Sequence, residues 1–184
     1  MKTLTAFVAA IVVQFIALSS ASAGIAGPYV VELAGTYSKV IVTGSAATGV
    51  KTVVKPLNKA ALCGLLNVEP SKHVLVVFSN KVMLLNKQTG ATVANFMTLG
   101  NSFIFGSVKG SFAYEARFFD DIESVGSFSG KYRLSPAAKY LILTGNFQGG
   151  TSNPPVIVGG GAENSALFFK GKVIYVKNYT GPLL

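Results

Sequence analysis

The chain has 184 residues, of which 50% are hydrophobic and only 12% are charged, so it is neither a disordered tail nor a linker, which need low hydrophobicity and dense charge. Twenty glycines and seven prolines exclude a coiled coil, because no heptad pattern continues past them. Basic residues outnumber acidic ones, 16 to 7, which gives a net charge of +9.

A leader peptide is predicted at residues 1–23. Lys2 is followed by an apolar stretch over residues 6–18 and by the small-residue triplet Ala21-Ser22-Ala23. This order is typical of a cleaved secretory signal peptide, and the stretch is shorter than the roughly 20 apolar residues of a membrane span. We expect residues 24–184 to form one secreted, extracellular β-rich domain, in the periplasm or at the cell surface if the source is bacterial. Removal of Lys2 lowers the net charge from +9 to +8.

Short runs rich in valine, isoleucine, tyrosine, phenylalanine and threonine recur along the rest of the chain, separated by glycine, asparagine, serine or proline. Such runs are typical of β-strands. In one of them Phe112, Tyr114 and Phe118 fall on the same face, as in an antiparallel sheet with one buried side. Strands are expected at 29–34, 37–43, 50–55, 73–78, 81–86, 91–98, 102–106, 111–119, 126–133, 139–147, 155–159, 165–170 and 172–178.

Many short strands and very little helix predict an all-β fold, an antiparallel β-sandwich or barrel, with at most one short helix near residues 57–66. Tight hairpin turns are expected at Ser79-Asn80 and at Lys170-Gly171. The sequence around the first turn, residues 78–82, resembles residues 169–173. This likeness leaves two alternatives open, two related half-domains or a chance resemblance between hairpins.

Groups that could support catalysis or bind a metal are sparse. Cys63 lies in an apolar run, where a buried and inert thiol is expected, although a disulfide to another chain stays open. His73 is the one histidine, so too few ligands exist for a zinc site built from cysteine and histidine. A Cys63–His73 dyad is conceivable, but a structural histidine at the start of an apolar strand is the simpler interpretation. We expect no enzymatic activity, no cofactor and no metal.

Asp120, Asp121 and Glu123 follow the strand predicted at 111–119, and a fourth carboxylate, Glu115, lies within it. Paired carboxylates serve glycoside hydrolysis or calcium binding. The ligand spacing of a calcium loop is missing, however, so an acidic turn is the simpler interpretation. The glycines of Gly126-Ser127-Phe128-Ser129-Gly130 indicate a bend or bulge, because the segment lacks the central serine of a nucleophile elbow.

The positive charge gives the clearest indication of a partner. The lysines are spread along the chain with no basic run, which disfavours binding to nucleic acid. Lys170, Lys172 and Lys177 form the most local basic patch and are the predicted contact for an anionic ligand. Asn178 begins an acceptor sequence for N-glycosylation, Asn178-Tyr179-Thr180.

Two main function classes follow from these observations, and a hydrolase that uses the carboxylates of residues 115–123 is a third, less favoured one. The first is a secreted, non-catalytic structural or surface-assembly protein that joins copies of itself into oligomers or fibres through strand edges. The alternative is an extracellular module that binds acidic polysaccharide of the cell surface or matrix, or an anionic membrane surface to which it attaches peripherally. Aromatic rings exposed on the surface would favour the binding module. The alternation of apolar and polar residues instead favours a place in the core for the aromatic residues in question: Phe103, Phe105, Phe112, Tyr114, Phe118 and Phe119.

Overall fold

The computed structural model describes residues 28–42, 50–102, 108–134, 141–151 and 164–184. The predicted leader peptide and the strand predicted at 155–159 lie outside these residues, as does all but the first residue of the strand predicted at 102–106.

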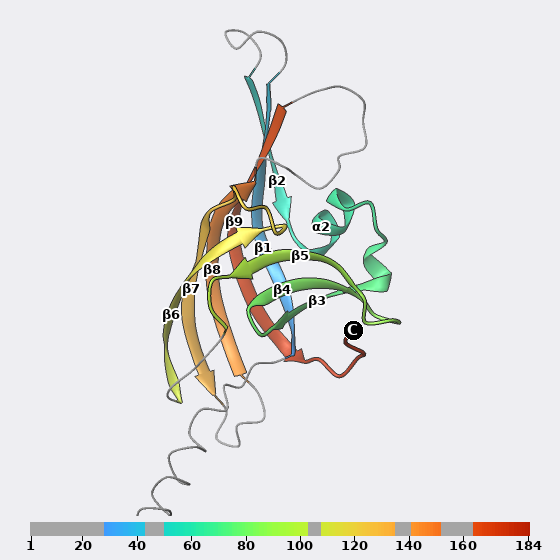
Figure 1. The fold of residues 1–184 in the computed structure, drawn as a ribbon, viewed down its shortest axis with the longest axis vertical. Helices are drawn as coiled ribbons and strands as arrows, with labels where there is room; N and C mark the ends of the chain where they lie inside the picture. Colours follow the sequence, from blue (N-terminus) through green and yellow to red (C-terminus); the bar gives the residue numbers. More distant parts are fainter. Residues whose placement is uncertain (1–27, 43–49, 103–107, 135–140, 152–163) are drawn as a thin grey trace, which may run out of the picture.

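Strands make up most of the described chain and confirm the predicted all-β fold (Figure 1). Each strand pairs antiparallel with its neighbours. Their bounds are β1 Tyr29–Val42, β2 Val50–Leu57, β3 His73–Phe78, β4 Lys81–Asn86, β5 Thr92–Leu99, β6 Lys109–Phe118, β7 Gly126–Leu134, β8 Leu141–Thr151 and β9 Asn164–Asn178.

The sheet closes into a barrel. Its strand order is β2-β1-β3-β4-β5-β6-β7-β8-β9, and β1 also pairs with β9, so that eight strands form a ring and β2 stands outside it. Each strand of the ring from β3 onward lies next to the strand that follows it in sequence, which is an up-and-down arrangement. Of the two predicted architectures, the structure is the barrel.

β1 divides its outer edge between two partners. Tyr29 and Val30 pair with β3, whereas residues from Gly35 to Val42 pair with β2. Its other edge pairs with β9 along nearly its whole length. After Val30, β1 and β3 therefore no longer lie side by side, and a notch separates them on the outside of the barrel.

The hairpin predicted at Lys170-Gly171 is wrong, because β9 runs through this position as one strand and merges two predicted ones. Gly171 lies directly opposite Gly35 of β1, and a Cβ atom on Gly171 would come within 2.9 Å of the Gly35 Cα. Glycine here allows two strands to approach closely instead of turning the chain. The Ser79-Asn80 turn is confirmed between β3 and β4. Residues 78–82 therefore contain a turn, whereas the similar residues 169–173 lie within one strand. This sequence likeness indicates no structural repeat.

An aromatic cluster fills the barrel. The ring of Phe96 lies 5.5 Å from that of Phe118, 5.6 Å from that of Phe147 and 5.5 Å from that of Phe169, measured between centroids, and all four side chains are buried. The steep angles between these planes give edge-to-face contacts, which stabilise aromatic pairs beyond their buried area.

Glycines on the inward face of β7 and β8 leave room for further rings. Gly130 lies opposite Gly145, and a Cβ atom on Gly145 would overlap the Phe128 ring. A Cβ atom on Gly130 would come within 2.9 Å of the Phe112 Cζ. The bend or bulge predicted for residues 126–130 is therefore wrong: the segment keeps regular pairing with both neighbouring strands, and its glycines serve packing.

One short helix, α2 (Lys59–Leu65), and a 3-10 turn, η1 (Pro70–Lys72), connect β2 to β3. The helix confirms the prediction for this region. Asn58 caps it, because its Oδ1 accepts a hydrogen bond of 2.9 Å from the Ala61 amide. Cys63 lies on the buried side of α2 within the main core. No helix among the described residues has the length and hydropathy to cross a membrane.

Candidate binding surface

The three lysines of the predicted patch all lie on the outer face of β9, where they are exposed. Lys170 and Lys172 are two residues apart in an extended strand, so their Cα atoms lie about 7 Å apart on the same side. Lys177 follows a register shift and lies opposite Val30, farther along the strand. The structure thus brings Lys170 and Lys172 together at one hollow and places Lys177 at a different one.

Each of the two neighbouring lysines lies in a row of polar side chains that crosses several strands. In the first row, Lys170 lies between Thr36 of β1 and Gln148 of β8, and Ser127 of β7 follows Gln148. Adjacent strands lie about 4.8 Å apart, so each row offers a hydrogen-bonding group at nearly every strand.

The second row lies one side-chain pair farther along the barrel. Lys172 lies between Ala34 of β1 and Asn146 of β8, and Ser129 of β7 follows Asn146. The two rows line a shallow hollow of about 630 Å³ on the outside of the barrel. We call this surface the polar face, made of Thr36, Ser127, Ser129, Asn146, Gln148, Lys170 and Lys172.

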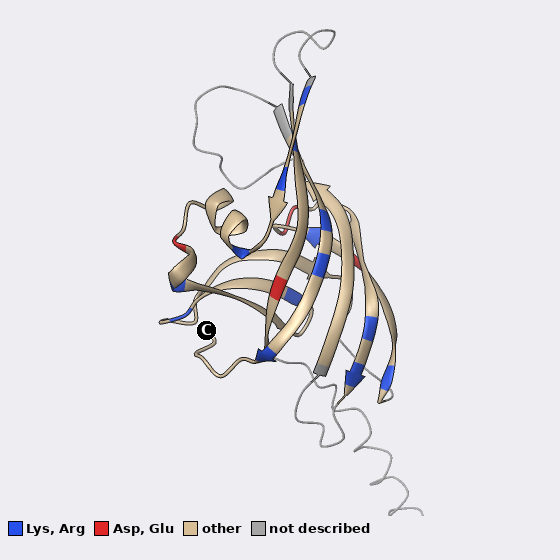
Figure 2. Ribbon diagram, turned by 180° about the vertical axis from the view of Figure 1, so that it is seen from behind, with Lys and Arg blue, Asp and Glu red and all other residues tan. Residues whose placement is uncertain are grey.

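The polar face is electrostatically positive. Neither Lys170 nor Lys172 forms an ion pair with any part of the chain that the structure describes. Basic residues continue on β6 and β7, where Lys109, Lys131 and Arg133 are exposed. Figure 2 shows these basic positions distributed over neighbouring strands, with few acidic ones among them.

An exposed aromatic ring borders the polar face. Phe168 lies on the same side of β9, two residues before Lys170, and is 53% exposed. Its ring covers Gly150 of β8, at which a Cβ atom would come within 2.9 Å of the ring. Sequence reasoning missed Phe168, Asn146 and Gln148, although alternation with the buried neighbours Phe147 and Phe169 could have placed all three on the outside.

The aromatic residues that the sequence predicts to be in the core lie in it or pack against it where the structure describes them. Phe112 and Phe118 are buried, and Tyr114 and Phe119 are half-buried against the core. The remaining two, at 103 and 105, lie outside the described residues.

The acidic residues after β6 hold a turn together. Asp120 accepts hydrogen bonds from the Asn95 Nδ2 at 2.5 Å and the Thr98 Oγ1 at 2.7 Å. Asp121 accepts from the Glu123 amide at 3.0 Å and from the Thr151 hydroxyl. These bonds fit the interpretation of an acidic turn. Within the described ranges no three histidine, cysteine or acidic residues form a group that could hold a metal ion.

Cys63 and His73 are both buried, and no hydrogen bond joins them in the described part of the chain. The His73 Nδ1 lies 2.6 Å from the carbonyl oxygen of Glu69, which fits a structural histidine at the start of β3. Burial raises the pKa of the Cys63 thiol, and nearby Lys59 lowers it by less. The thiol is therefore buried and largely protonated, as expected for an inert cysteine.

Asn178 is exposed at the end of β9, and its Oδ1 accepts a hydrogen bond of 3.1 Å from the Tyr175 hydroxyl. Its glycosylation stays a prediction.

Comparison of the chain with protein-family models, with curated proteins and with solved structures gives no match.

Proposed function

We propose that this chain is a secreted, non-catalytic module that binds an acidic polysaccharide on the polar face. The observation that carries the proposal is the hollow in which Lys170 and Lys172, free of ion pairs within the described chain, lie among amide and hydroxyl side chains from β1, β7 and β8. Lysine ammonium groups attract carboxylates or sulfates, and the neutral polar groups supply partners for sugar hydroxyls.

The geometry favours an extended, polyvalent ligand over a compact one. A chain laid across the strands meets a new polar side chain about every 4.8 Å along each row. Exposed basic residues continue beyond the hollow along β7, at Lys131 and Arg133, with Lys109 of β6 opposite Arg133, whereas the exposed Glu115 of β6 lies opposite Ser127 and ends the first row. The Phe168 ring adds an apolar surface next to Lys170, suited to the C–H face of a sugar ring.

An anionic membrane surface is the less favoured anionic partner. A peripheral membrane site combines basic side chains with several apolar ones that enter the lipid boundary. The polar face instead presents serine, threonine and amide side chains between its lysines. Vesicles of anionic lipid therefore serve as a comparison ligand in the test.

The test compares two double variants of equal charge. Lys170→Gln with Lys172→Gln removes the lysines of the polar face, and Lys51→Gln with Lys55→Gln removes two exposed lysines of β2, which stands outside the ring. We expect titration calorimetry with polygalacturonate to show binding about tenfold weaker for the first variant, and little change for the second, at low salt. Salt should weaken the wild-type binding, because it screens exposed charges.

Three outcomes would contradict the proposal. Equal weakening in both double variants would mean that only net charge matters. Equal binding of the neutral polymer dextran would mean that the lysines do not select the ligand. Tighter binding to anionic vesicles than to polygalacturonate would favour the membrane surface.

Self-assembly through strand edges is the second candidate, because β2 has an edge with no partner strand among the described residues. Val54 on β2 is 62% exposed. Barrel closure removes most other edges, and Lys51, Lys55 and Pro56 on β2 are residue types that discourage edge pairing, so we rank this function second. Sedimentation velocity tests it: edge assembly predicts oligomers of the wild type that Val54→Lys converts to monomers, and a monomeric wild type contradicts it.

A further inference from the structure

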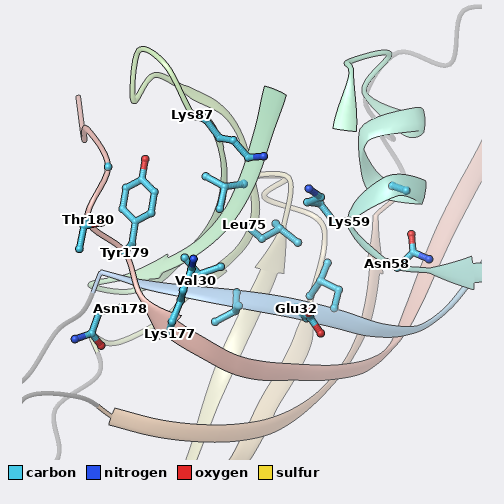
Figure 3. A pocket seen from close by; sticks show the side chains of 15 residues that line it. Val30, Glu32, Asn58, Lys59, Leu75, Lys87, Lys177, Asn178, Tyr179 and Thr180 are labelled. Carbon is cyan, nitrogen blue, oxygen red and sulfur yellow. The ribbon is translucent and has the colours of Figure 1, made fainter. Parts of the chain in front are cut away.

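A second hollow lies in the notch where β1 and β3 separate. Pairing between these strands ends at Val30 and Val76, after which β1 pairs with β2. The start of α2 borders the notch on one side, and residues 177–181 border it on the other (Figure 3). The hollow has a volume of about 580 Å³, within the range of sites that bind small molecules.

The base of this hollow is apolar. Val30 of β1 and Val74 and Leu75 of β3 line it, and Ala60 contributes a small side chain from the first turn of α2. The Tyr179 ring rises beside them from the segment that follows β9 (Figure 3). Such a surface favours contact with hydrocarbon over contact with water.

Lysines from separate elements surround this apolar base. The Lys59 Nζ donates hydrogen bonds to the carbonyl oxygens of Pro70, at 2.9 Å, and His73, at 3.2 Å. The Lys87 Nζ donates to the carbonyl oxygen of Ser71 at 2.7 Å. Backbone carbonyls at and beside η1 therefore fix both ammonium groups, and the two point toward each other above the apolar base (Figure 3).

The charge of these lysines is not neutralised locally. None of the three lysines forms an ion pair with the described residues: Lys59, Lys87 and Lys177. Among the described residues, Glu32 is the one acidic residue that lines the hollow, and its carboxylate points away from Lys59 and Lys87 (Figure 3). An ammonium has three N–H groups, so Lys59, with two bonds to carbonyl oxygens, and Lys87, with one, each keep at least one N–H for a ligand.

We propose that this notch binds a small amphiphilic carboxylate. The carboxylate lies between the Lys59 and Lys87 ammonium groups, and the hydrocarbon part lies over Val30, Val74 and Leu75. A purely polar anion would leave the apolar base in contact with water, and a neutral hydrocarbon would leave the ammonium groups without a counter-charge. The site is independent of the polar face, because the two hollows share no lining residue.

Titration calorimetry of the folded chain with octanoate, 1-octanol and acetate tests the ligand class. We expect saturable binding of one octanoate, with at least tenfold weaker binding of acetate and of 1-octanol, each of which lacks one half of the recognised chemistry. Equal affinity for octanoate and 1-octanol would overturn the role of the lysines. Absence of octanoate binding would overturn the proposal as a whole.

Two variants locate the site. Lys87→Gln should weaken octanoate binding about tenfold, the effect of one charge-assisted hydrogen bond, and Ala60→Phe should abolish it by filling the hollow from an exposed position of α2. The polar-face variant, Lys170→Gln with Lys172→Gln, is the matched control and should bind octanoate as the wild type does. Unchanged binding in both notch variants, with thermal unfolding showing that they are folded, would contradict the proposal, whatever the result with polygalacturonate.

Discussion

Glycine has an uncommon role on the inward face of this barrel, because several glycines lie opposite one another in paired strands and not in turns. Gly130 faces Gly145, and Gly35 faces Gly171. In each pair an added Cβ atom would meet neighbouring backbone or an aromatic ring at less than 3.0 Å. The missing side chains give the phenylalanine rings their space, so that glycine and phenylalanine together set the packing of the core.

Substitution at Gly145 tests this packing role. Gly145→Ala should lower the free energy of unfolding by about 1–3 kcal/mol, because its Cβ overlaps the Phe128 ring and the core is already filled. Gly64→Ala is the matched control: it lies in α2 with nothing within 4 Å of its added Cβ, and should raise stability by about 0.5–1 kcal/mol. Urea unfolding measures both, and a neutral Gly145→Ala would contradict the packing argument.

The buried thiol of Cys63 makes stability depend on alkaline pH. Its pKa in the folded chain is raised above the ordinary value of 9.0, mainly by burial. The unfolded thiol therefore loses its proton at a pH where the folded thiol keeps it, so its stabilising effect is complete below the unfolded pKa and is lost as the pH rises. The free energy of unfolding should fall between about pH 7.5 and pH 10 more steeply in the wild type than in Cys63→Ala. Parallel pH profiles of the two proteins would show that the thiol is not the cause.

Among the single elements, the strands whose ends are bounded by strong turn-forming sequences are predicted most accurately. The strands predicted at 73–78 and 81–86 coincide with β3 and β4, because a continuous apolar run is interrupted there by Ser79-Asn80. The sequence predicts two strands where β9 is one, because a glycine within a strand resembles a turn when its partner strand is unknown. The prediction that Lys170 and Lys172 lie close together is correct, but its reason is wrong. The two residues are close because they lie on one face of a strand, and not because a turn lies between them.

The segment after β9 packs on the outer side of β3 and β4. Tyr179 lies against a small apolar cluster of Val76, Met83 and Leu85, and its amide donates a hydrogen bond of 3.0 Å to the Pro28 carbonyl. This segment covers apolar side chains that the barrel itself leaves on the outside, because their strand positions alternate with those that face the interior.

Removal of the Tyr179 ring tests whether this contact stabilises the fold. Tyr179→Ala should lower the free energy of unfolding by about 1–2 kcal/mol, less than for a fully buried aromatic residue because the ring is only half-buried. Leu184→Ala, at a position that is 89% exposed, should change stability by less than about 0.5 kcal/mol. Equal effects of the two substitutions in urea unfolding would mean that the segment does not stabilise β3 and β4.

Closure of the barrel belongs to the scale of the whole molecule and could not be derived from the sequence. It depends on pairing between β1 and β9, the first and last strands, and local strand patterns carry no information on which distant strands meet. The candidate site depends on the same closure, because Thr36 of β1 reaches Lys170 only through this pairing. The sequence therefore supplied the lysines of the polar face but not their neighbours.

The proposed location of the protein also concerns the molecule as a whole. If residues 1–23 are a cleaved leader, protein collected outside the cell after expression of the full chain should begin at Gly24 by N-terminal sequencing. A Lys2→Glu variant should be exported less efficiently, because the positive start of the leader is lost. An exported protein that retains Met1, or a chain that stays inside the cell, would contradict the prediction.

The central claim is that the polar face on the outside of a closed barrel is the surface that binds an acidic polysaccharide. Amide chemical shifts of the folded chain, followed by NMR during titration with a short oligogalacturonate, test it most directly. The account predicts saturable shifts at the polar face, on residues 127–129, 146–148 and 168–172, which added salt reverses. Shifts confined to other parts of the barrel, or none at all, would contradict it.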